Sequence, residues 1–462
     1  MNGTRSTSTP EIPSGTSHAA EPGITLRIHP VNGPTTQASL GLASLELVAP
    51  VEATTVFNVG SVAKQITAYL CVRAVQDGRL NLDRPVSEHL PRFQIPDVSV
   101  RDLIRHRGGV RDAESLLSLA GFRDLDHYTG ADLLELAYRQ DHRAVPPGHF
   151  LYSNTGYLLL AEILRQIHGG DLQDIAQQQV FNSLGMNATR FKRHPTEVIP
   201  GAASSYGPDG GGWSHQQRPV TLPGPGSLWC SAADLDRWLA HLADEWRRAA
   251  STSPMPFDGH VSYQPSDHTP FTYGAGLYAD PRRGRTAVFH YGHEQGFSAA
   301  THLTPWGLRI VCLSNRTDMP ADHILATVLA EIVGNPDVDA DQLLASATQN
   351  RRKHPTDTQP DAGPNLGPEE PHTILGTYEC EAVPGTLRLS LSAGVLHLWR
   401  RGAREPLQHT SQGQYTSDSY TLTFPAAQSD DAEFPPGEFI LDLRRAPDLR
   451  YRLKPGTVGG RG

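Results

Sequence analysis

Ser61 and Lys64 are the pair of residues in this chain best suited to covalent chemistry. They stand three positions apart in the stretch Phe57-Asn-Val-Gly-Ser-Val-Ala-Lys-Gln-Ile-Thr67, where a helix is expected to begin. Residues at i and i+3 lie on one face of a helix, so the amine can reach the hydroxyl and take its proton. Lysine is scarce, with four among 40 basic residues, and arginine could not replace Lys64 as a base.

The helix is predicted from apolar residues at helical spacing. These residues are Ile66, Tyr69, Leu70, Val72 and Val75, and the helix is expected to end at Asp77-Gly78. At its N-terminus, unpaired backbone N–H groups and the helix dipole disfavour an ammonium ion and favour developing negative charge. A lysine buried there can titrate low enough to be a neutral base. The plainer interpretation makes Ser61 an ordinary N-cap and Lys64 a solvated residue of the first turn.

Two further groups of polar residues could complete a site. Tyr152 and Asn154 stand in a loop before an apolar helix, where a phenol could relay protons and a carboxamide could orient a substrate carbonyl. His290 and Gly292 lie in a strand-like segment whose glycine permits close approach of a substrate. Taken singly, each residue is better explained by a structural role, Tyr152 as a core anchor and His290 as a hydrogen-bonded strand histidine. His290 and His293 would face opposite sides of a strand, so they do not predict a metal site.

Taken together and in this order, Ser61-x-x-Lys64, Tyr152-x-Asn154 and His290-x-Gly292 resemble the three motifs of the serine β-lactamase and penicillin-binding-protein superfamily. The histidine form of the third motif is similar to the class C-like branch that holds D-aminopeptidases and esterases. The resemblance covers about residues 24–335. Within it, Arg107 and Gly108 replace the Thr and Ser of a usual family segment, a change expected to alter the wall of the cleft.

The resemblance implies an α+β fold, with an antiparallel sheet, flanking helices and an all-α lobe around a cleft at Ser61. It also implies that Lys64 acts as general base, that Tyr152 relays protons and that Ser61 attacks a carbonyl. The oxyanion would be held by the backbone N–H groups of Ser61 and His293. His290 replaces the lysine that binds a substrate carboxylate in penicillin-binding proteins. Because histidine is largely neutral near pH 7, recognition of a free carboxylate or a β-lactam is expected to be weak.

Three functions are compatible with this site. The first is a serine acyl-enzyme hydrolase or acyltransferase that resembles D-aminopeptidases and esterases and takes peptides, esters or thioesters with a D-amino-acid acyl residue. The alternative resembles penicillin-binding-protein-type thioesterases, which macrocyclise nonribosomal peptides, with a substrate presented by a carrier protein. The least favoured is a non-catalytic binding protein that retains the fold, since the Ser, Lys, Tyr and Asn of the motifs are all present.

The chain is expected to contain two folded domains. Residues 1–23 are rich in Ser, Thr, Pro and Gly and predict a disordered tail before a catalytic domain at 24–345. Residues 346–371 predict a linker. Residues 372–455 alternate with period 2, which predicts an antiparallel β-barrel, lipocalin-like by resemblance, followed by a tail at 456–462. The barrel is expected to gate the cleft without supplying a core catalytic group.

Composition narrows the range of partners. The net charge of −9 is spread along the chain, so nucleic acid is not an expected partner. No segment approaches the roughly 20 apolar residues that a membrane-spanning helix needs. The four cysteines are scattered without a C-x-x-C pair, which predicts structural or free thiols rather than a zinc site, and no cofactor is expected. Without an export signal, the cytoplasm is the expected compartment.

Overall fold

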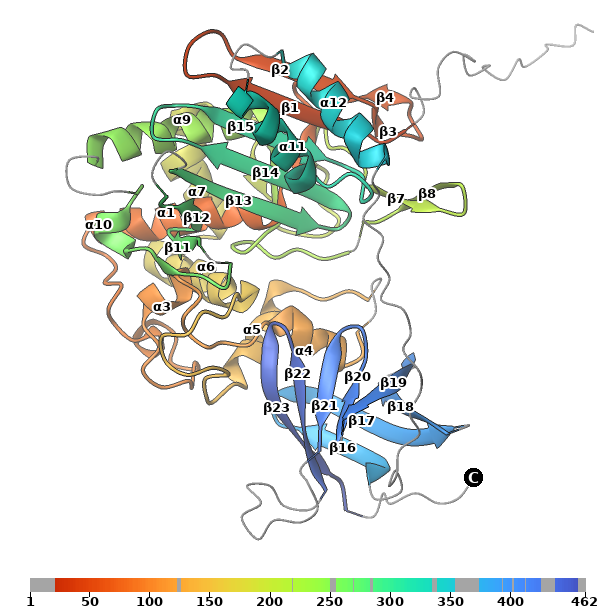
Figure 1. Cartoon of the computed structure of the whole chain (residues 1–462). Helices are drawn as coiled ribbons and strands as arrows, with labels where there is room; N and C mark the ends of the chain where they lie inside the picture. The colour runs from red at the N-terminus through yellow and green to blue at the C-terminus, as the bar shows by residue number, and fades with distance from the viewer. Residues whose placement is uncertain are drawn as a thin grey trace, which may run out of the picture.

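The structure, a computed structural model, contains a large α+β domain and a small β-barrel (Figure 1). It describes residues 21–122, 126–217, 219–249, 255–268, 270–282, 286–334, 339–353, 374–392, 394–400, 403–411, 413–424 and 437–455. The predicted tail at 456–462, residues 1–20 of the N-terminal tail and residues 354–371 of the predicted linker lie outside these ranges.

An eight-stranded antiparallel sheet organises the catalytic domain. Its order is β10 (Gln264–Pro265), β11 (Thr272–Gly274), β12 (Leu277–Asp280), β13 (Ala287–Glu294), β14 (Phe297–Leu303), β15 (Arg309–Ser314), β1 (Ile24–His29) and β2 (Thr36–Leu40). Strand β15 is apolar on both faces. Ile310 and Cys312 pack into one core, and Val311 and Leu313 into another, as the period-2 geometry of a strand requires.

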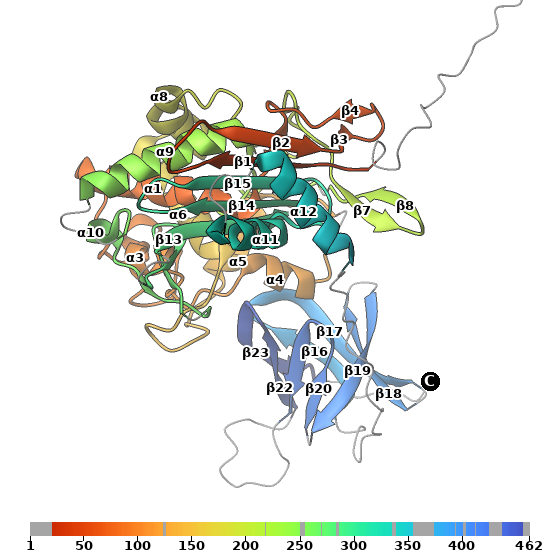
Figure 2. The ribbon, with the colours of Figure 1, turned by 45° about the horizontal axis from the view of Figure 1, so that its top comes forward.

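Helices cover both faces of the sheet (Figure 2). On one face lie α11 (Ala321–Gly334) and α12 (Ala340–Lys353), and on the other α1 (Ala63–Gln76) and α9 (Ala232–Ala249). Helix α12 buries Leu344 and Ala347 and continues to Lys353. The predicted start of the linker at residue 346 is therefore wrong, because these apolar residues extend the catalytic domain.

A lobe of short helices completes the domain, as predicted. It contains α2 (Val86–His89), α3 (Val100–Ile104), α4 (Ala113–Leu119), α5 (Gly130–Tyr138), α6 (Asn154–His168), α7 (Leu172–Ala176), η2 (Gln177–Phe181) and α8 (Asn182–Leu184). The remaining elements are a short helix, α10 (Asp258–Val261), and three small sheets: β3 (Leu42–Ser44) with β4 (Ala49–Pro50), β5 (Val56–Asn58) and β6 (Arg190–Phe191) with β9 (Leu228–Ser231), and β7 (Tyr206–Asp209) with β8 (Gly212–His215). Strand β5 leads directly into the 3-10 turn η1 (Gly60–Val62), which holds the nucleophile candidate.

The C-terminal domain is a closed antiparallel barrel, which confirms the predicted fold class. Its strands are β16 (Gly376–Cys380), β17 (Val383–Ser392), β18 (Val395–Arg400), β19 (Ala403–Ser411), β20 (Gln414–Thr416), β21 (Tyr420–Thr423), β22 (Glu438–Leu443) and β23 (Ala446–Leu453). Pairing of β16 with β23 closes it. Alternating residues such as Leu387, Leu398 and Leu441 fill its interior.

The barrel is docked on the helical lobe, next to α4 in Figure 1. Helix α4 supplies Leu116 and Leu117 to an apolar cluster that continues into the barrel. Arg400 of β18 donates hydrogen bonds of 2.9 Å to the backbone carbonyl and to the hydroxyl of Ser118. The contact therefore combines apolar burial with directed polar bonds, which fix the orientation of the barrel.

Two further properties bear on the sequence predictions. All four cysteines carry free thiols, and Cys71, Cys230 and Cys312 are buried. No helix in the described ranges is long and apolar enough to cross a membrane.

Gln65 ties helix α1 to both neighbouring layers. Its buried side chain accepts a hydrogen bond from Trp238 Nε1 at 2.8 Å and donates one to Thr301 Oγ1 at 2.9 Å. Gln65→Leu leaves the buried Trp238 Nε1 without this acceptor and removes the donor to Thr301 Oγ1, so we expect the free energy of unfolding in urea to fall by about 2 kcal/mol or more. Gln76→Leu, at the exposed end of the helix, is the control and should change it little. A Gln65→Leu protein as stable as the native one would contradict this role.

Candidate active site

The residues of the three sequence motifs meet at one cavity of about 1130 Å³. Ser61 reaches it from η1, Tyr152 and Asn154 from the start of α6, and His290 and His293 from strand β13. The structure thus brings together side chains that are more than 200 residues apart in the sequence.

Lys64 is fully buried, directly beneath the nucleophile candidate. Its Nζ lies 2.8 Å from each of three oxygen atoms: Ser61 Oγ, Asn154 Oδ1 and the backbone carbonyl of Pro225. The carboxamide and carbonyl oxygens can only accept hydrogen bonds. A neutral amine therefore donates its two N–H groups to Asn154 and Pro225 and directs its lone pair at the Ser61 hydroxyl.

The electrostatic surroundings favour this neutral amine. The pKa of Lys64 is lowered from 10.5 to about 7, first by burial and then by the positive charge of Arg445, while the carboxylates of Asp112, Glu114 and Glu294 act in the opposite direction. A general base works best when its pKa lies near the operating pH. Lys64 has both the geometry and the protonation equilibrium of such a base.

Asn154 is held in place by two acidic residues that we did not predict. Its Nδ2 donates to Glu114 Oε2 at 2.7 Å, and its backbone N–H donates to Asp112 Oδ2 at 2.8 Å. These contacts turn the carboxamide oxygen towards Lys64, so Asn154 orients the base, whereas the sequence suggested that it orients a substrate carbonyl. Burial, followed by the charge of Asp112, raises the pKa of Glu114 above its usual range. In the sequence, both acids look like ordinary residues at a helix start.

Tyr152 lies beside the Ser61–Lys64 pair. The centroid of its ring is 5.0 Å from Lys64 Nζ, and its hydroxyl is hydrogen-bonded to Ser61. Burial raises the pKa of Tyr152 above that of a free phenol, although the hydrogen bond to Ser61 acts in the opposite direction. The phenol therefore stays protonated at neutral pH and is suited to passing a proton on.

His290 is buried and neutral. Its Nδ1 donates to the carbonyl oxygen of Tyr291 at 2.6 Å, so its Nε2 accepts from the Tyr273 hydroxyl at 3.2 Å. Burial, together with the charge of Lys64, lowers the pKa of His290 to about 3. His290 therefore supplies neither a base nor a positive charge near pH 7, in keeping with weak recognition of a free carboxylate.

Two glycines allow β13 to lie directly against the nucleophile turn. A Cβ at Gly292 would come within 2.0 Å of the Val59 carbonyl oxygen and 2.9 Å of the Ser61 nitrogen. A Cβ at Gly60, whose φ is +48°, would come within 2.9 Å of the His293 nitrogen. The backbones that carry the N–H groups of Ser61 and His293 are thus in contact, which is the proximity that the predicted oxyanion hole requires.

The remaining edge of β13 is open towards the cavity. Pairing between β12 and β13 runs from Asp280↔Ala287 to Tyr278↔Phe289, so residues 290–294 have no β12 partner among the described strands. The His293 side chain points out of the sheet and lies 3.2 Å from Asp322 Oδ1. An extended substrate can approach this edge, as expected for the third motif.

A loop before β9 supplies the third partner of Lys64. The Pro225 carbonyl is positioned by its neighbours: Thr67 Oγ1 donates to the Gly224 carbonyl at 2.8 Å, and Ser227 donates to Glu294 through its backbone N–H at 2.8 Å and its hydroxyl at 3.0 Å. We did not predict this role, because a backbone carbonyl carries no signature in the sequence.

The cavity wall differs from the one expected. Arg107 and Gly108 are not among the described lining residues, and Arg107 instead donates to the Pro265 carbonyl at 2.6 Å. The prediction that they alter the cleft wall is therefore wrong. Two arginines of the barrel, Arg444 and Arg445, line the cavity instead. Much of the remaining wall is aromatic, from Tyr128, Phe150, Phe271, Tyr278, Phe289 and Tyr291.

The state of Lys64 predicts the pH dependence of Ser61 acylation. Only the neutral amine can accept the Ser61 proton, so the acylation rate should rise with pH through about 7 and then level off. The rate is measured by intact-protein mass spectrometry with an activated acyl thioester. Lys64→Arg should remove the adduct over this range, since a guanidinium stays protonated. A rate that falls with increasing pH would contradict this assignment.

Gly292→Ala tests the contact between β13 and the nucleophile turn. The added Cβ would lie 2.0 Å from Val59 O, so the strand must move away from Ser61. We expect acylation to slow by about 100-fold, the loss that accompanies removal of one oxyanion donor, while thermal unfolding shows a folded protein. Gly170→Ala, where an added Cβ meets no atom within 4 Å, is the matched control. Equal rates for the two variants would exclude the proposed oxyanion geometry.

Known proteins that resemble this chain identify its family and its fold. Residues 16–334 match the Beta-lactamase family. The D-aminopeptidase of Cereibacter sphaeroides is 27% identical over 302 residues, which cover 64% of this chain and 57% of that protein. This chain thus spans little more than half the length of the curated relatives that it matches first.

Two solved structures show the same fold. A penicillin-binding protein homologue from Pyrococcus abyssi superposes with a TM-score of 0.59 at 20% identity, over 93% of this chain and 95% of that one. The D-amino acid amidase from Ochrobactrum anthropi SV3 superposes with a TM-score of 0.56 at 22% identity, over 71% of this chain and 94% of that one. Since the family match spans more than half of the residues and its three motifs meet in one cavity, the chain belongs to the Beta-lactamase family.

Proposed function

We propose that this protein is a serine hydrolase that forms an acyl-enzyme on Ser61 and acts on D-aminoacyl amides, peptides, esters or thioesters. One observation carries the proposal: a buried lysine whose other two contacts are obligate acceptors lies 2.8 Å from the hydroxyl of Ser61. Relatives named D-aminopeptidase and D-amino acid amidase support the D-configured substrate.

Acylation follows from the positions of these groups. Ser61 Oγ forms a bond with the substrate carbonyl carbon while its proton passes to Lys64. The carbonyl oxygen becomes an oxyanion and accepts hydrogen bonds from the backbone N–H groups of Ser61 and His293. The bond to the leaving group then breaks, and the proton from Lys64 reaches that group through Tyr152. Water repeats these steps in reverse order and releases the acid.

The cavity also suggests how a D-aminoacyl group is bound. Glu114 places a buried carboxyl on the wall beside Asn154, where the α-amino group of a substrate could pair with it. The aromatic wall of Phe150, Phe271, Tyr278 and Phe289 offers an apolar surface to the acyl side chain. We therefore propose a substrate with a free amine and an apolar or aromatic D-residue.

Acyl transfer to an amine is the second candidate. In a penicillin-binding-protein-type thioesterase, the amine of the same peptide would attack the acyl-enzyme and close a ring. The observation that favours it is the barrel turn with Arg444 and Arg445 at the cavity, because a covered site limits the access of competing water. A tethered amine also gains from its high effective concentration.

The covalent step is tested by intact-protein mass spectrometry. Incubation with an activated D-phenylalanyl thioester should add one acyl mass to the native protein. Ser61→Ala should abolish this adduct, and Lys64→Ala should slow its formation by about 100-fold or more, as loss of a general base does. Ser115→Ala, a hydroxyl deletion on helix α4, is the control that should react normally. An adduct on the Ser61→Ala protein would refute the assigned nucleophile.

Substrate choice is tested with matched substrates. D-phenylalanine p-nitroanilide should be hydrolysed faster than its L-epimer and faster than its N-acetyl derivative, and Glu114→Gln should reduce the ratio of the rates for the free amine and its N-acetyl derivative. A peptidyl thioester with a C-terminal D-residue and a free N-terminus separates the two candidates. Linear acid supports the hydrolase, whereas mostly cyclic product supports the transferase. Equal reaction of the two epimers would contradict the stereochemical proposal.

A further inference from the structure

The turn between β22 and β23 carries Arg445 from the barrel to the catalytic site. The backbone carbonyl of Arg445 accepts a hydrogen bond of 2.9 Å from the backbone N–H of Asp112. The carboxylate of Asp112 also holds the backbone N–H of Asn154. The guanidinium carbon of Arg445 lies 4.9 Å from the ring centroid of Tyr152. Lys64 Nζ lies 5.0 Å from the same centroid. A cation from the second domain thus shares an aromatic neighbour with the proposed base.

Arg111 of the catalytic domain holds this turn from the other side. Only 1% of it is exposed, so its donors must be satisfied inside the protein. Its Nε donates to the Pro447 carbonyl at 2.8 Å, and its Nη2 to the Asp448 carbonyl at 2.7 Å. Both carbonyls stand two or three positions after Arg445. A fully buried arginine therefore joins the two domains next to the active site.

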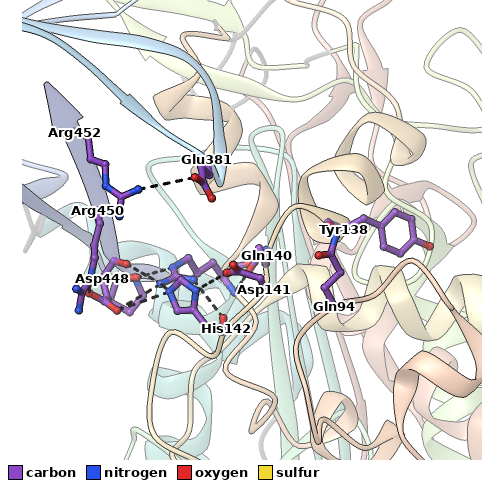
Figure 3. A network of polar contacts seen from close by, with 11 residues as sticks. Gln94, Tyr138, Gln140, Asp141, His142, Glu381, Asp448, Arg450 and Arg452 are labelled. Carbon is purple, nitrogen blue, oxygen red and sulfur yellow. Dashed lines mark hydrogen bonds and ion pairs between the residues drawn. The ribbon is translucent and has the colours of Figure 1, made fainter. Parts of the chain in front are cut away.

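The surrounding network keeps Arg111 in place. Gln140 accepts from the Arg111 backbone N–H at 2.8 Å and donates to its carbonyl at 3.1 Å. His142 Nε2 lies 3.0 Å from Arg111 Nη2, and Asp141 accepts at 2.6 Å from His142 Nδ1. Figure 3 shows Gln140, Asp141 and His142 of the lobe facing Asp448 of the barrel. Arg111, its partners in the lobe and the barrel hairpin thus form a clamp, which combines residues of both domains.

Strand β23 has a constrained backbone directly after the turn. Asp448 has a φ of +55°, in the left-handed region that side chains other than glycine seldom adopt. Its backbone N–H donates to Asp442 Oδ1 at 2.7 Å, which ties the two sides of the hairpin together. Together with the Arg111 bonds, this constraint defines where the preceding residues lie.

We propose that Arg445 is a positioning residue that the barrel contributes to the active site, and that Arg111 acts through it by clamping the β22–β23 turn. The inference rests on the proposed role of Lys64 as the base. The positive charge of Arg445 opposes a second positive charge on Lys64 and so favours the neutral amine. The barrel is then a fixed part of the catalytic apparatus, in addition to covering the cavity.

The sign of the effect follows from the groups around Lys64. Carboxylates favour its charged form, whereas burial and Arg445 favour its neutral form. The nearby histidines and tyrosines are neutral at pH 7, because burial lowers the pKa of the histidines and raises that of the tyrosines. The carboxylates are those of Asp112, Glu114 and Glu294. The histidines are His106 and His290, and the tyrosines are Tyr152 and Tyr157. Loss of Arg445 therefore raises the pKa of Lys64.

The chain offers a direct test, because it contains only four lysines: Lys64, Lys192, Lys353 and Lys454. Uniform incorporation of ¹³Cε-lysine gives four signals, and the signal missing from Lys64→Ala identifies Lys64. Its titration midpoint should move to higher pH in Arg445→Gln and stay close to the native value in Arg445→Lys. Arg404→Gln removes an exposed arginine elsewhere on the barrel and is the charge-matched control.

Arg111→Gln tests the clamp. Its Lys64 midpoint should move in the same direction as that of Arg445→Gln, and the double variant should show little further change, since Arg111 acts through Arg445. The acylation rate at pH 6 should fall by about threefold or more in Arg445→Gln, while the rate at pH 9 should stay near the native value. Thermal unfolding establishes that each variant is folded.

Two results would overturn the inference. The first is a Lys64 midpoint that is the same in Arg445→Gln and in the native protein. The second is a double variant whose shift is the sum of the single shifts, since Arg111 would then act independently of Arg445. Neither result depends on finding a substrate. Failure of the native protein to acylate would count against the proposed function alone, because the lysine titration is read without a substrate.

Discussion

The burial of Lys64 is the constraint on which the rest of the site depends. A pKa lowered from 10.5 to about 7 corresponds to about 5 kcal/mol that favours the neutral amine. The same energy is lost from the stability of the folded chain when Lys64 has to be charged. The full cost applies below pH 7, where Lys64 is charged in both the folded and the unfolded chain. It declines as the pH rises from 7 to 10.5, where folding releases a proton, and disappears above that range. In the proposed mechanism this cost serves the reaction, because a charged or solvated lysine could not take the proton of Ser61.

Each neighbour of Lys64 has a second partner that holds it in place. The Pro225 carbonyl belongs to a loop that is fixed through Ser227 and Glu294. The Asn154 carboxamide is oriented by Glu114. Because these partners are themselves hydrogen-bonded, the amine has two defined acceptors and its lone pair has one direction. Preorganisation of this kind avoids rearrangement during the reaction.

Directed hydrogen bonds also hold the two domains together. The apolar cluster under helix α4 extends into the barrel, and Arg400 and Arg111 add directed bonds at two separate points. The cap of helix α4, Asp112, therefore bonds to both sides: its backbone N–H donates to the Arg445 carbonyl of the barrel, and its carboxylate accepts from the backbone N–H of Asn154. A displacement of the barrel would be transmitted to Lys64 through few bonds, and this is the path by which the proposed effect of the barrel on catalysis would act.

The sequence by itself determined the local features: a helix that begins near Ser61 and ends at Asp77-Gly78, an apolar helix after the Tyr152-x-Asn154 motif, the alternation of the barrel strands and the three motifs. These follow from periodicity and from side-chain chemistry, which are legible along the chain. Only the tertiary structure decided that Pro225, Glu114 and Arg445 surround the base, and that helix α12 extends to Lys353 in place of the predicted linker. A backbone carbonyl has no sequence signature, and a charge acts through distance in space, whatever the separation of the residues along the chain.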